Sequence, residues 1–197
     1  RKTILADRFE GKRFNSINDL AIGRGGAIYF SDPPYGLAEG DESPLRELGY
    51  NGLFVRRSDG TIHVIDKTLR RPNGVALCPK GTTLYVALSD DTRPQLLAYP
   101  LDLQGMPRGG PTLFHDFTAE HAAGLPGLPD GLKVDKAGRI FATGPGGCYV
   151  LSSEGKRLGR IETGKAVANC VFGEDGRTLF LTSHTMLARV RLKTSGW

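Results

Sequence analysis

Short apolar runs separated by polar turns fill the whole chain, and this pattern predicts a protein built almost entirely from β-strands. Most runs carry β-branched or aromatic residues and are bounded by Gly, Pro, Asp or Ser, as strands usually are. No stretch sustains the apolar period of about 3.6 residues that marks a helix, and only residues 43–48 could form a helical turn. The expected strands are residues 3–6, 19–22, 27–31, 52–56, 62–66, 75–78, 83–88, 95–100, 112–115, 131–134, 139–143, 148–152, 159–162, 170–172, 178–182 and 187–192.

A repeat runs through these strands. Four segments share one plan, in which a polar residue is followed by an apolar strand, a turn with Gly and a second apolar strand. They are INDLAIGRGGAIYFSD, PNGVALCPKGTTLYVAL, PDGLKVDKAGRIFATG and ANCVFGEDGRTLFLTS. A period of about 40 to 57 residues with four strands per unit is typical of a β-propeller, in which each unit is a blade. A β-sandwich could use as many strands but would not produce the repeat, so the sequence predicts an all-β propeller.

The chain encodes about four blades, at residues 18–66, 73–115, 130–162 and 169–192, and the last has only three strands. The strand expected at residues 3–6 could complete the last blade and close the ring, because a strand from the other terminus can cover an otherwise bare edge. It could equally be the last strand of an upstream blade. Residues 1–197 are therefore expected to form a single β-propeller domain, or the C-terminal four-blade portion of one.

The polar residues that lead the four segments should converge on one mouth of the central channel. In an antiparallel meander, the start of the first strand and the loop between the second and third strands lie on the same face. A ring of amide and carboxylate oxygens suits a hard cation such as Ca²⁺, whereas a softer metal would favour His or Cys. The same residues could instead only make turns, since Asn-Gly and Asp-Gly are common turn dipeptides. The four are Asn18, Asn73, Asp130 and Asn169.

Composition excludes several classes of protein. Hydrophobic content of 39% and charged content of 24% are ordinary for a globular chain of 197 residues. The net charge of +5 comes from basic residues interleaved with Asp and Glu, and the one dense cluster, residues 67–71, is short. A solvated basic surface is expected there, with no nucleic acid partner. No apolar run approaches a membrane span and no signal-peptide core follows the amino terminus, which favours a cytoplasmic protein without a membrane partner.

Few other residues suggest chemistry. Cys78, Cys148 and Cys170 are odd in number and unclustered, so they should pack as small apolar residues in a reducing compartment. His184 lies in a loop of the expected mouth face and could be a general base or simply a surface histidine. No G-x-S-x-G elbow, P-loop or dinucleotide fingerprint is present.

The motifs, taken together, resemble one family over essentially the whole chain. NSINDLAIGRGGAIYFSDPPYGL, ELGYNGLFV, RPNGVALCPKGTTLYVA, LPDGLKVDKAGRIFATG and NCVFGEDGRTLFLTS follow in this order, and they closely resemble the SMP-30/gluconolactonase/luciferin-regenerating-enzyme family. The resemblance implies a six-bladed β-propeller with a divalent metal at the top of its channel. Ca²⁺ is the expected ion, with Zn²⁺, Mg²⁺ or Mn²⁺ as alternatives. It also implies hydrolysis of sugar lactones such as gluconolactone.

The resemblance further implies roles for individual residues. Asn73 in RPNGV and Asp130 in LPDGL match metal ligands, and Asn18 in SINDL would lie at the metal as a ligand or substrate contact. Asp130 is also the candidate to activate water. Some members carry Arg two residues before the position of Asn18, where this chain has Ser16. The family's metal-binding Glu belongs to a first blade that would precede residue 1, so no residue here is assigned that role.

Two functions are expected from these residues. The first is a metal-dependent lactonase acting on a sugar lactone, with Asn18, Tyr35 and Asn169 as substrate contacts. The second is a catalytically inactive propeller fragment or binding scaffold that lacks the Glu, and self-association could then complete the propeller. Metal binding should be weak, because one carboxylate with two amides gives little ligand charge. A further carboxylate from Asp19, Asp32 or a neighbouring subunit would strengthen it.

Overall fold

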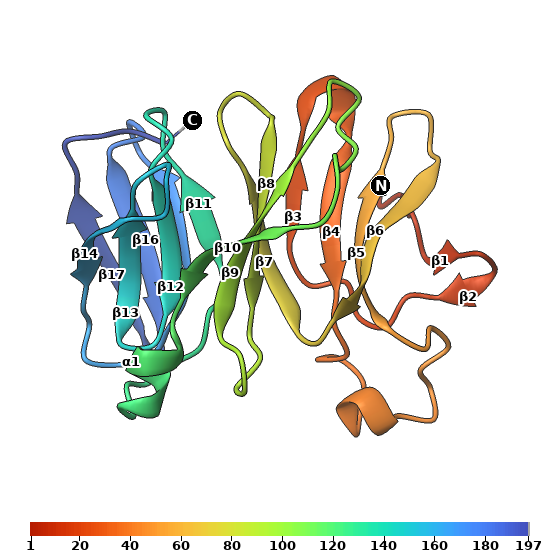
Figure 1. The fold of residues 1–197 in the computed structure, drawn as a ribbon, viewed down its shortest axis with the longest axis horizontal. Coiled ribbons are helices and arrows are strands. Elements are labelled where there is room, and N and C mark those ends of the chain that lie inside the picture. Colours follow the sequence, from red (N-terminus) through yellow and green to blue (C-terminus); the bar gives the residue numbers. More distant parts are fainter. Residues whose placement is uncertain (197) are drawn as a thin grey trace.

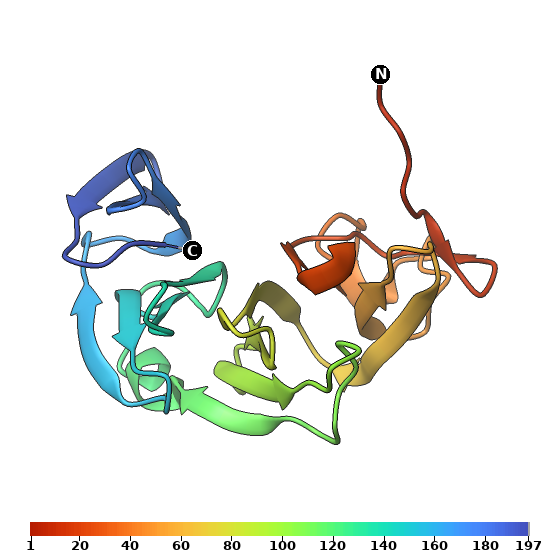
Figure 2. The same ribbon diagram turned by 90° about the horizontal axis from the view of Figure 1, so that it is seen from above.

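A computed structural model of the chain describes residues 1–196, which form four antiparallel sheets arranged side by side in an open arc (Figures 1 and 2). Within each sheet, neighbouring strands follow one another in the chain. The sheets are β3 (Leu20–Ile22), β4 (Ile28–Asp32), β5 (Asn51–Arg56) and β6 (Ile62–Leu69); β7 (Pro72–Leu77), β8 (Thr83–Leu88), β9 (Gln95–Pro100) and β10 (Thr112–Asp116); β11 (Leu132–Val134), β12 (Ile140–Gly144), β13 (Gly147–Leu151) and β14 (Arg157–Ile161); and β15 (Val167–Gly173), β16 (Thr178–Ser183) and β17 (Met186–Arg191). The predicted all-β propeller architecture is confirmed, with four blades.

The strand expected at residues 3–6 is wrong. Those residues form no strand, and the side chains of Ile4 and Leu5 are exposed. The first paired segments are instead a small hairpin of β1 (Arg8–Phe9) and β2 (Lys12–Arg13). Figure 2 shows the N-terminal segment at the opposite end of the arc from the last sheet, which has three strands.

The helical segments are short. The turn expected at residues 43–48 is a single hydrogen-bonded turn from Ser43 to Arg46, directly after the 3-10 helix η2 (Gly40–Glu42). A second 3-10 helix is η1 (Arg24–Gly26), and the one α-helix of residues 1–196 is α1 (Thr118–Ala122). The sequence did not predict α1, because five residues are too few to show a helical period.

The apolar core lies between successive sheets, because each strand alternates its side chains between two neighbours. On β8, Leu84, Val86 and Leu88 pack toward the first sheet, while Tyr85 and Ala87 pack toward the third. A third cluster lies between the third and fourth sheets, and an aromatic cluster covers the free face of the first sheet. The core is therefore a series of inter-blade layers.

The inner strands of neighbouring blades approach one another closely at glycines. A Cβ added at Gly74 would lie 2.1 Å from the backbone oxygen of Asp130, and one added at Gly131 would lie 2.1 Å from Oδ1 of Asn169. The equivalent residue of the first blade is Asp19, whose Oδ2 accepts a hydrogen bond from the backbone N–H of Val75 (3.2 Å). Each contact sets the leading polar residue of one blade against the blade before it.

Two of the three cysteines are buried, as the sequence predicted. Cys148 and Cys170 are buried in one core cluster with Phe141 and Val167, so they do pack as small apolar residues, whereas Cys78 is half-buried. No helix within residues 1–196 has the length and apolar character needed to cross a membrane.

Replacing Gly74 by Ala should destabilise the protein by about 2 kcal/mol or more, because the new methyl group would overlap the backbone of Asp130 and force neighbouring blades apart. Gly159 on β14 offers a matched control, since a Cβ there meets no atom within 4 Å. Its substitution by Ala should change stability by no more than about 0.5 kcal/mol. Urea unfolding of both variants measures the difference, and equal stability of the two would contradict the packing argument.

Candidate functional site

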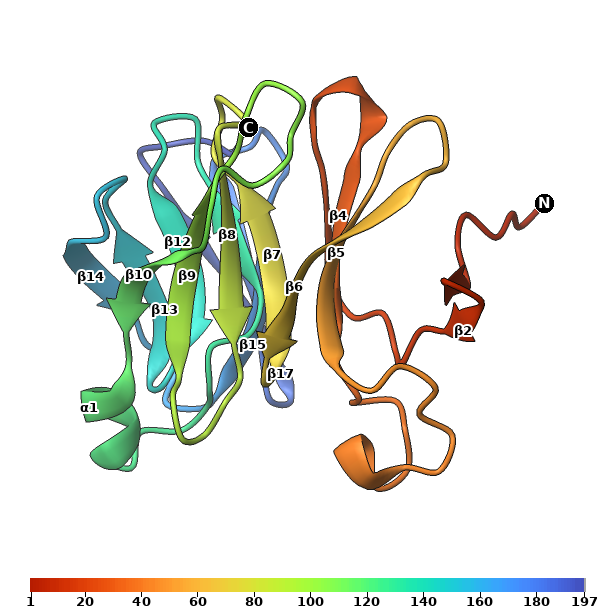
Figure 3. The same cartoon turned by 45° about the vertical axis from the view of Figure 1, so that its right-hand side comes forward.

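The inner strands begin on the same edge of the arc as the loops between second and third strands, as predicted. These loops follow β4, β8, β12 and β16. The long β4–β5 loop and α1 project from this edge as well, at the bottom of Figures 1 and 3. The mouth of the propeller channel therefore lies there.

Asn18 and Asn73 meet at this mouth. Nδ2 of Asn18 donates to Oδ1 of Asn73 at 2.5 Å. Nδ2 of Asn73 donates to the hydroxyl of Ser89 (2.8 Å), and that hydroxyl donates to the backbone oxygen of Pro129 (2.5 Å). This chain of hydrogen bonds connects the first three blades and leaves Asn73 only 7% exposed.

A β-bulge directs Asn73 toward the mouth. The pairing of β7 with β8 shifts between Pro72 and Val75, so that Asn73 and Gly74 together oppose Ala87. A second shift lies between Val167 and Asn169 on β15. Bulges of this kind re-aim side chains and are frequent beside active sites. The local sequence thus combines a glycine needed for close packing with a bulge that turns the preceding amide.

Asp130 is the carboxylate nearest to this pair. Burial raises the pKa of Asp130 to about 6; the side-chain amide of Asn73 opposes the rise, and the nearby carboxylate of Asp19 adds to it. No ion pair among residues 1–196 involves Asp130. A half-buried carboxylate with a pKa close to neutrality and no basic partner is suited to accept a proton or to face a cation.

A cavity of about 400 Å³ brings three of the predicted site residues together, namely Tyr35, Asn73 and Asp130. The hydroxyl of Tyr35 donates to the backbone oxygen of Arg71 (3.4 Å), and burial raises the pKa of this tyrosine. Asn18 reaches the cavity through its bond to Asn73. The remaining lining residues are Arg71, Ser89, Gly127, Leu128, Ala166, Val167 and Ala168.

Asn169 is not among these lining residues. Its Oδ1 accepts a hydrogen bond from the backbone N–H of Cys170 (2.8 Å), and its side chain lies over Gly131. It lines a separate, mainly apolar cavity on the last blade, together with Lys133 and Leu187. The structure therefore brings Asn18, Asn73 and Asp130 together but leaves Asn169 apart from them.

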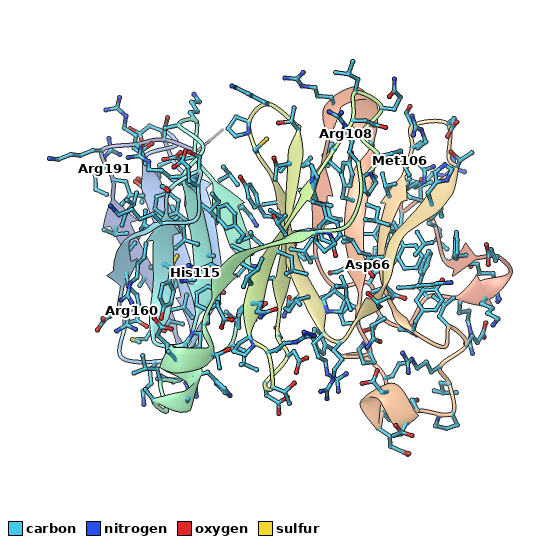
Figure 4. All side chains as sticks on the ribbon, in the orientation of Figure 1. Asp66, Met106, Arg108, His115, Arg160 and Arg191 are labelled. Carbon is cyan, nitrogen blue, oxygen red and sulfur yellow. The ribbon has the colours of Figure 1, made fainter. Side chains whose placement is uncertain are left out.

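The histidines add no group to this cavity. His184 is exposed in the turn between β16 and β17. His115 on β10 packs against Phe117, with ring centroids 4.6 Å apart, and burial lowers its pKa (Figure 4).

Asp19 and Asp32 were expected as possible further carboxylate ligands for a metal, and they lie in different surroundings. Asp32 is fully buried, and its two carboxylate oxygens accept the backbone N–H groups of Asn15 and Ser16 at 2.8 Å each. Burial raises the pKa of Asp32 to about 6, but its oxygens are used to fix the chain that leads to Asn18. Asp19 lies close enough to Asp130 to raise the pKa of that group.

The residues at the mouth have the types of oxygen ligand that a hard cation prefers. Asn73 and Asp130 could hold it with amide and carboxylate oxygens, and Asn18 is in contact with Asn73. Within residues 1–196, no group of three or more His, Cys, Asp and Glu side chains is arranged to bind a metal. The donor set therefore matches Ca²⁺ in chemistry but contains fewer charged ligands than a strong site.

Seven of the ten lining residues were not predicted as site residues, namely Arg71, Ser89, Gly127, Leu128, Ala166, Val167 and Ala168. Arg71 was counted within the basic cluster at residues 67–71 and interpreted as surface. The repeat carries a usable signal, because Arg71, Leu128 and Val167 each stand two residues before a leading polar residue and all three line the cavity.

Comparison with known proteins identifies the family of this chain. Residues 1–185 match the family described as the SMP-30/Gluconolactonase/LRE-like region. The chain is 46% identical over 199 residues to a gluconolactonase of Zymomonas mobilis subsp. mobilis, and the match covers 100% of this chain and 56% of that protein. The chain thus spans little more than half the length of this relative.

Solved structures of similar proteins have the same fold. A gluconolactonase from Xanthomonas campestris superposes with a TM-score of 0.82 at 32% identity, covering 96% of this chain and 61% of the other. The calcium-binding protein regucalcin from Agrobacterium tumefaciens gives a TM-score of 0.71 at 21% identity, covering 92% and 62%. At this lower identity the likeness shows a shared fold alone.

Replacing Asp130 by Asn should stabilise the chelator-treated protein at neutral pH. The folded-state pKa of about 6 lies above the usual 3.8, so the charged form disfavours folding above about pH 6 and has no such effect below about pH 4. Wild-type stability should therefore fall as the pH rises through this window. The variant should lack that loss and be more stable by about 1 to 3 kcal/mol at pH 7.

Urea unfolding between about pH 4 and pH 8 measures this difference. Asp91→Asn, which changes an exposed aspartate, is the control and should follow the wild type at every pH. A stabilisation by Asp130→Asn that is equally large at both ends of the range would show that burial of charge is not its cause.

Proposed function

This chain belongs to the SMP-30/gluconolactonase/LRE-like family, and from that premise we propose that it is a lactone hydrolase whose reacting groups meet in the cavity of Asn73 and Asp130. The observation that carries the proposal is the placement of Asp130. Its carboxyl group, with a pKa of about 6, borders the cavity beside a buried amide and has no basic partner within residues 1–196. Hydrolysis needs a group that can take a proton from water near neutral pH.

The substrate we propose is a sugar lactone. Support comes from the similarity to a gluconolactonase and from a cavity whose polar wall offers a tyrosine hydroxyl, a serine hydroxyl, an amide and a guanidinium. These groups could bind the hydroxyl substituents of such a lactone. The long loop at residues 33–50 carries Tyr35 and would shape the opening. We further propose that the four blades belong to a single propeller domain.

In this mechanism Asp130 accepts a proton from the attacking water as the water oxygen bonds to the lactone carbonyl carbon, and Asn73 holds the lactone in place. The ring C–O bond then breaks, and the released alkoxide takes the proton back from Asp130 to give the hydroxy acid. Asn18 fixes the amide of Asn73 through their mutual hydrogen bond. A divalent cation, Ca²⁺ or else Zn²⁺, Mg²⁺ or Mn²⁺, held by Asn73, Asp130 and the neighbouring Asn18 would polarise the lactone carbonyl and stabilise negative charge on its oxygen. Tyr35 borders the cavity and would position the substrate.

Replacing Asp130 by Ala should abolish hydrolysis of D-glucono-δ-lactone, with a loss of at least about 100-fold, because no other carboxylate borders the cavity in residues 1–196. The released acid can be followed in a pH-stat, with and without Ca²⁺ or Zn²⁺. Asp91→Ala, a change of an exposed residue, should keep wild-type activity. Unchanged turnover in Asp130→Ala would remove this residue from the mechanism, and absence of turnover in the wild type with every metal would leave a binding scaffold.

Calcium should bind weakly to the chain, with a dissociation constant of about 10⁻⁴ M or higher, because the ligands within reach are one carboxylate and neutral amides. Isothermal titration calorimetry of the chelator-treated protein measures this constant. Asn73→Ala should weaken the binding further, since Asn73 supplies one of these oxygens. Binding tighter than about 10⁻⁶ M would show that further carboxylates complete the site.

A further inference from the structure

One position in the repeat supplies the cavity with its basic side chain and with two of its apolar side chains. It stands two residues before the leading polar residue of each blade, before or at the start of the inner strand. Arg71, Leu128 and Val167 occupy it in the second, third and fourth blades, and all three line the cavity. In the first blade Ser16 faces elsewhere, because its hydroxyl donates to the backbone oxygen of Pro33 (2.9 Å) and accepts from the N–H of Gly36 (2.8 Å).

Arg71 is held firmly at the edge of the cavity. Its backbone oxygen accepts hydrogen bonds from the N–H of Ser89 (2.9 Å) and the hydroxyl of Tyr35 (3.4 Å). Its guanidinium Nη1 lies 2.7 Å from Oδ2 of Asp41 in the β4–β5 loop. These contacts join the second blade to the loop that carries Tyr35. Burial raises the pKa of Tyr35 and the charge of Arg71 opposes that rise, so the guanidinium lies near the tyrosine hydroxyl.

Asp41 cannot neutralise every cation around it. Its Oδ1 lies 3.5 Å from Nη1 of Arg46 and accepts a hydrogen bond from Nδ2 of Asn51 (3.0 Å). Arg46 has a further partner in Oδ1 of Asn51, whereas Asp41 is the single ion-pair partner of Arg71 within residues 1–196. A guanidinium carries five N–H donors and no acceptor, so Arg71 retains donors beyond those that Asp41 satisfies.

The opposite wall of the cavity has no comparable group. It consists of Gly127, Leu128 and residues 166–168, which are Ala, Val and Ala. Any ligand in the cavity therefore meets hydrogen-bond donors on the side of Arg71 and methyl groups on the other side. A ligand edge rich in hydrogen-bond acceptors, such as two adjacent hydroxyl groups, is therefore best placed against the guanidinium, which can donate hydrogen bonds to it.

We propose that Arg71 is the specificity-determining residue of this cavity and that it selects polyhydroxylated lactones by binding their hydroxyl oxygens. The inference rests on the proposed lactone hydrolysis and names the residue that chooses its substrate class. A site built to hydrogen-bond a substrate hydroxyl rejects the analogue without it, because the donors of the site are then left unpaired. The simple cyclic ester δ-valerolactone, with no hydroxyl group, is that analogue.

Arg71→Met keeps much of the side-chain length and removes the donors. With D-glucono-δ-lactone as substrate it should lower kcat/KM by about 10- to 100-fold, mainly through KM, while kcat/KM for δ-valerolactone stays within about twofold. Arg71→Lys should recover only part of the loss, since an ammonium group lacks the planar fork. Arg70→Met is the matched control, because Arg70 is exposed, its Nη1 lies 3.7 Å from Oδ1 of Asp90, and it does not line the cavity. This variant should leave kcat/KM unchanged for both lactones.

A purely structural role for the pair of Arg71 and Asp41 makes a different prediction. If the pair only fastens the loop, Arg71→Met and Asp41→Asn should lower kcat/KM equally for both lactones. That result would overturn the proposal, as would an Arg71→Met variant that hydrolyses gluconolactone normally.

Binding of D-glucitol, an uncharged polyol without a carboxylate, separates this inference from the proposed function. Isothermal titration calorimetry should detect glucitol binding by the wild type and by Arg70→Met, with an affinity at least about 10-fold lower in Arg71→Met. If the wild type hydrolyses neither lactone but Arg71→Met shows this loss of affinity, the proposed hydrolase function is wrong and the role of Arg71 in ligand binding stands. Equal affinity in the two variants, or no binding by the wild type, would overturn the role of Arg71.

Discussion

The close approach of neighbouring inner strands is the constraint on which the site depends. At Gly74 and Gly131 the next blade lies so near that no side chain fits. The backbone of Asp130 is thereby set against the second blade, and the carboxylate above it comes within reach of Asn73 and Asp19. A looser junction would move these groups apart and admit water between them. The packing of the blades therefore determines the distances between the reactive groups at the mouth.

Two carboxylates, one buried and one half-buried, show how the surroundings of a group determine its role. Asp32 and Asp130 both have a pKa raised to about 6 by burial. Asp32 uses both oxygens for the backbone N–H groups of Asn15 and Ser16 and so organises the chain that leads to Asn18. Asp130 borders a cavity instead. A perturbed pKa alone would mark both as functional candidates, whereas the hydrogen bonds assign one to structure and one to chemistry.

The sequence predicted the fold well because a propeller repeats one local pattern. Every strand of the four blades was found, and β8 and β9 agree with prediction to the residue. The strand predicted at residues 3–6 was wrong because an apolar run does not by itself show that a neighbouring strand pairs with it, and Ile4 and Leu5 are exposed. At the mouth, the repeat identified Asn73 and Asp130, whose meeting follows from blade geometry. It could not show that Asn169 lines another cavity or that Arg71 borders this one, since bulges and side-chain directions depend on tertiary contacts.

Repetition also explains why the two walls of the cavity differ. The position two residues before the leading polar residue carries Ser16, Arg71, Leu128 and Val167 in successive blades, and the last three line the cavity. Arg71 and Leu128 lie outside the buried core clusters and can change their chemistry without disturbing the blade core, whereas Val167 packs in the core between the third and fourth sheets. A ring of equivalent positions with unequal side chains gives the cavity a polar side and an apolar side. Specificity can thus vary at the mouth while the packing beneath it stays fixed.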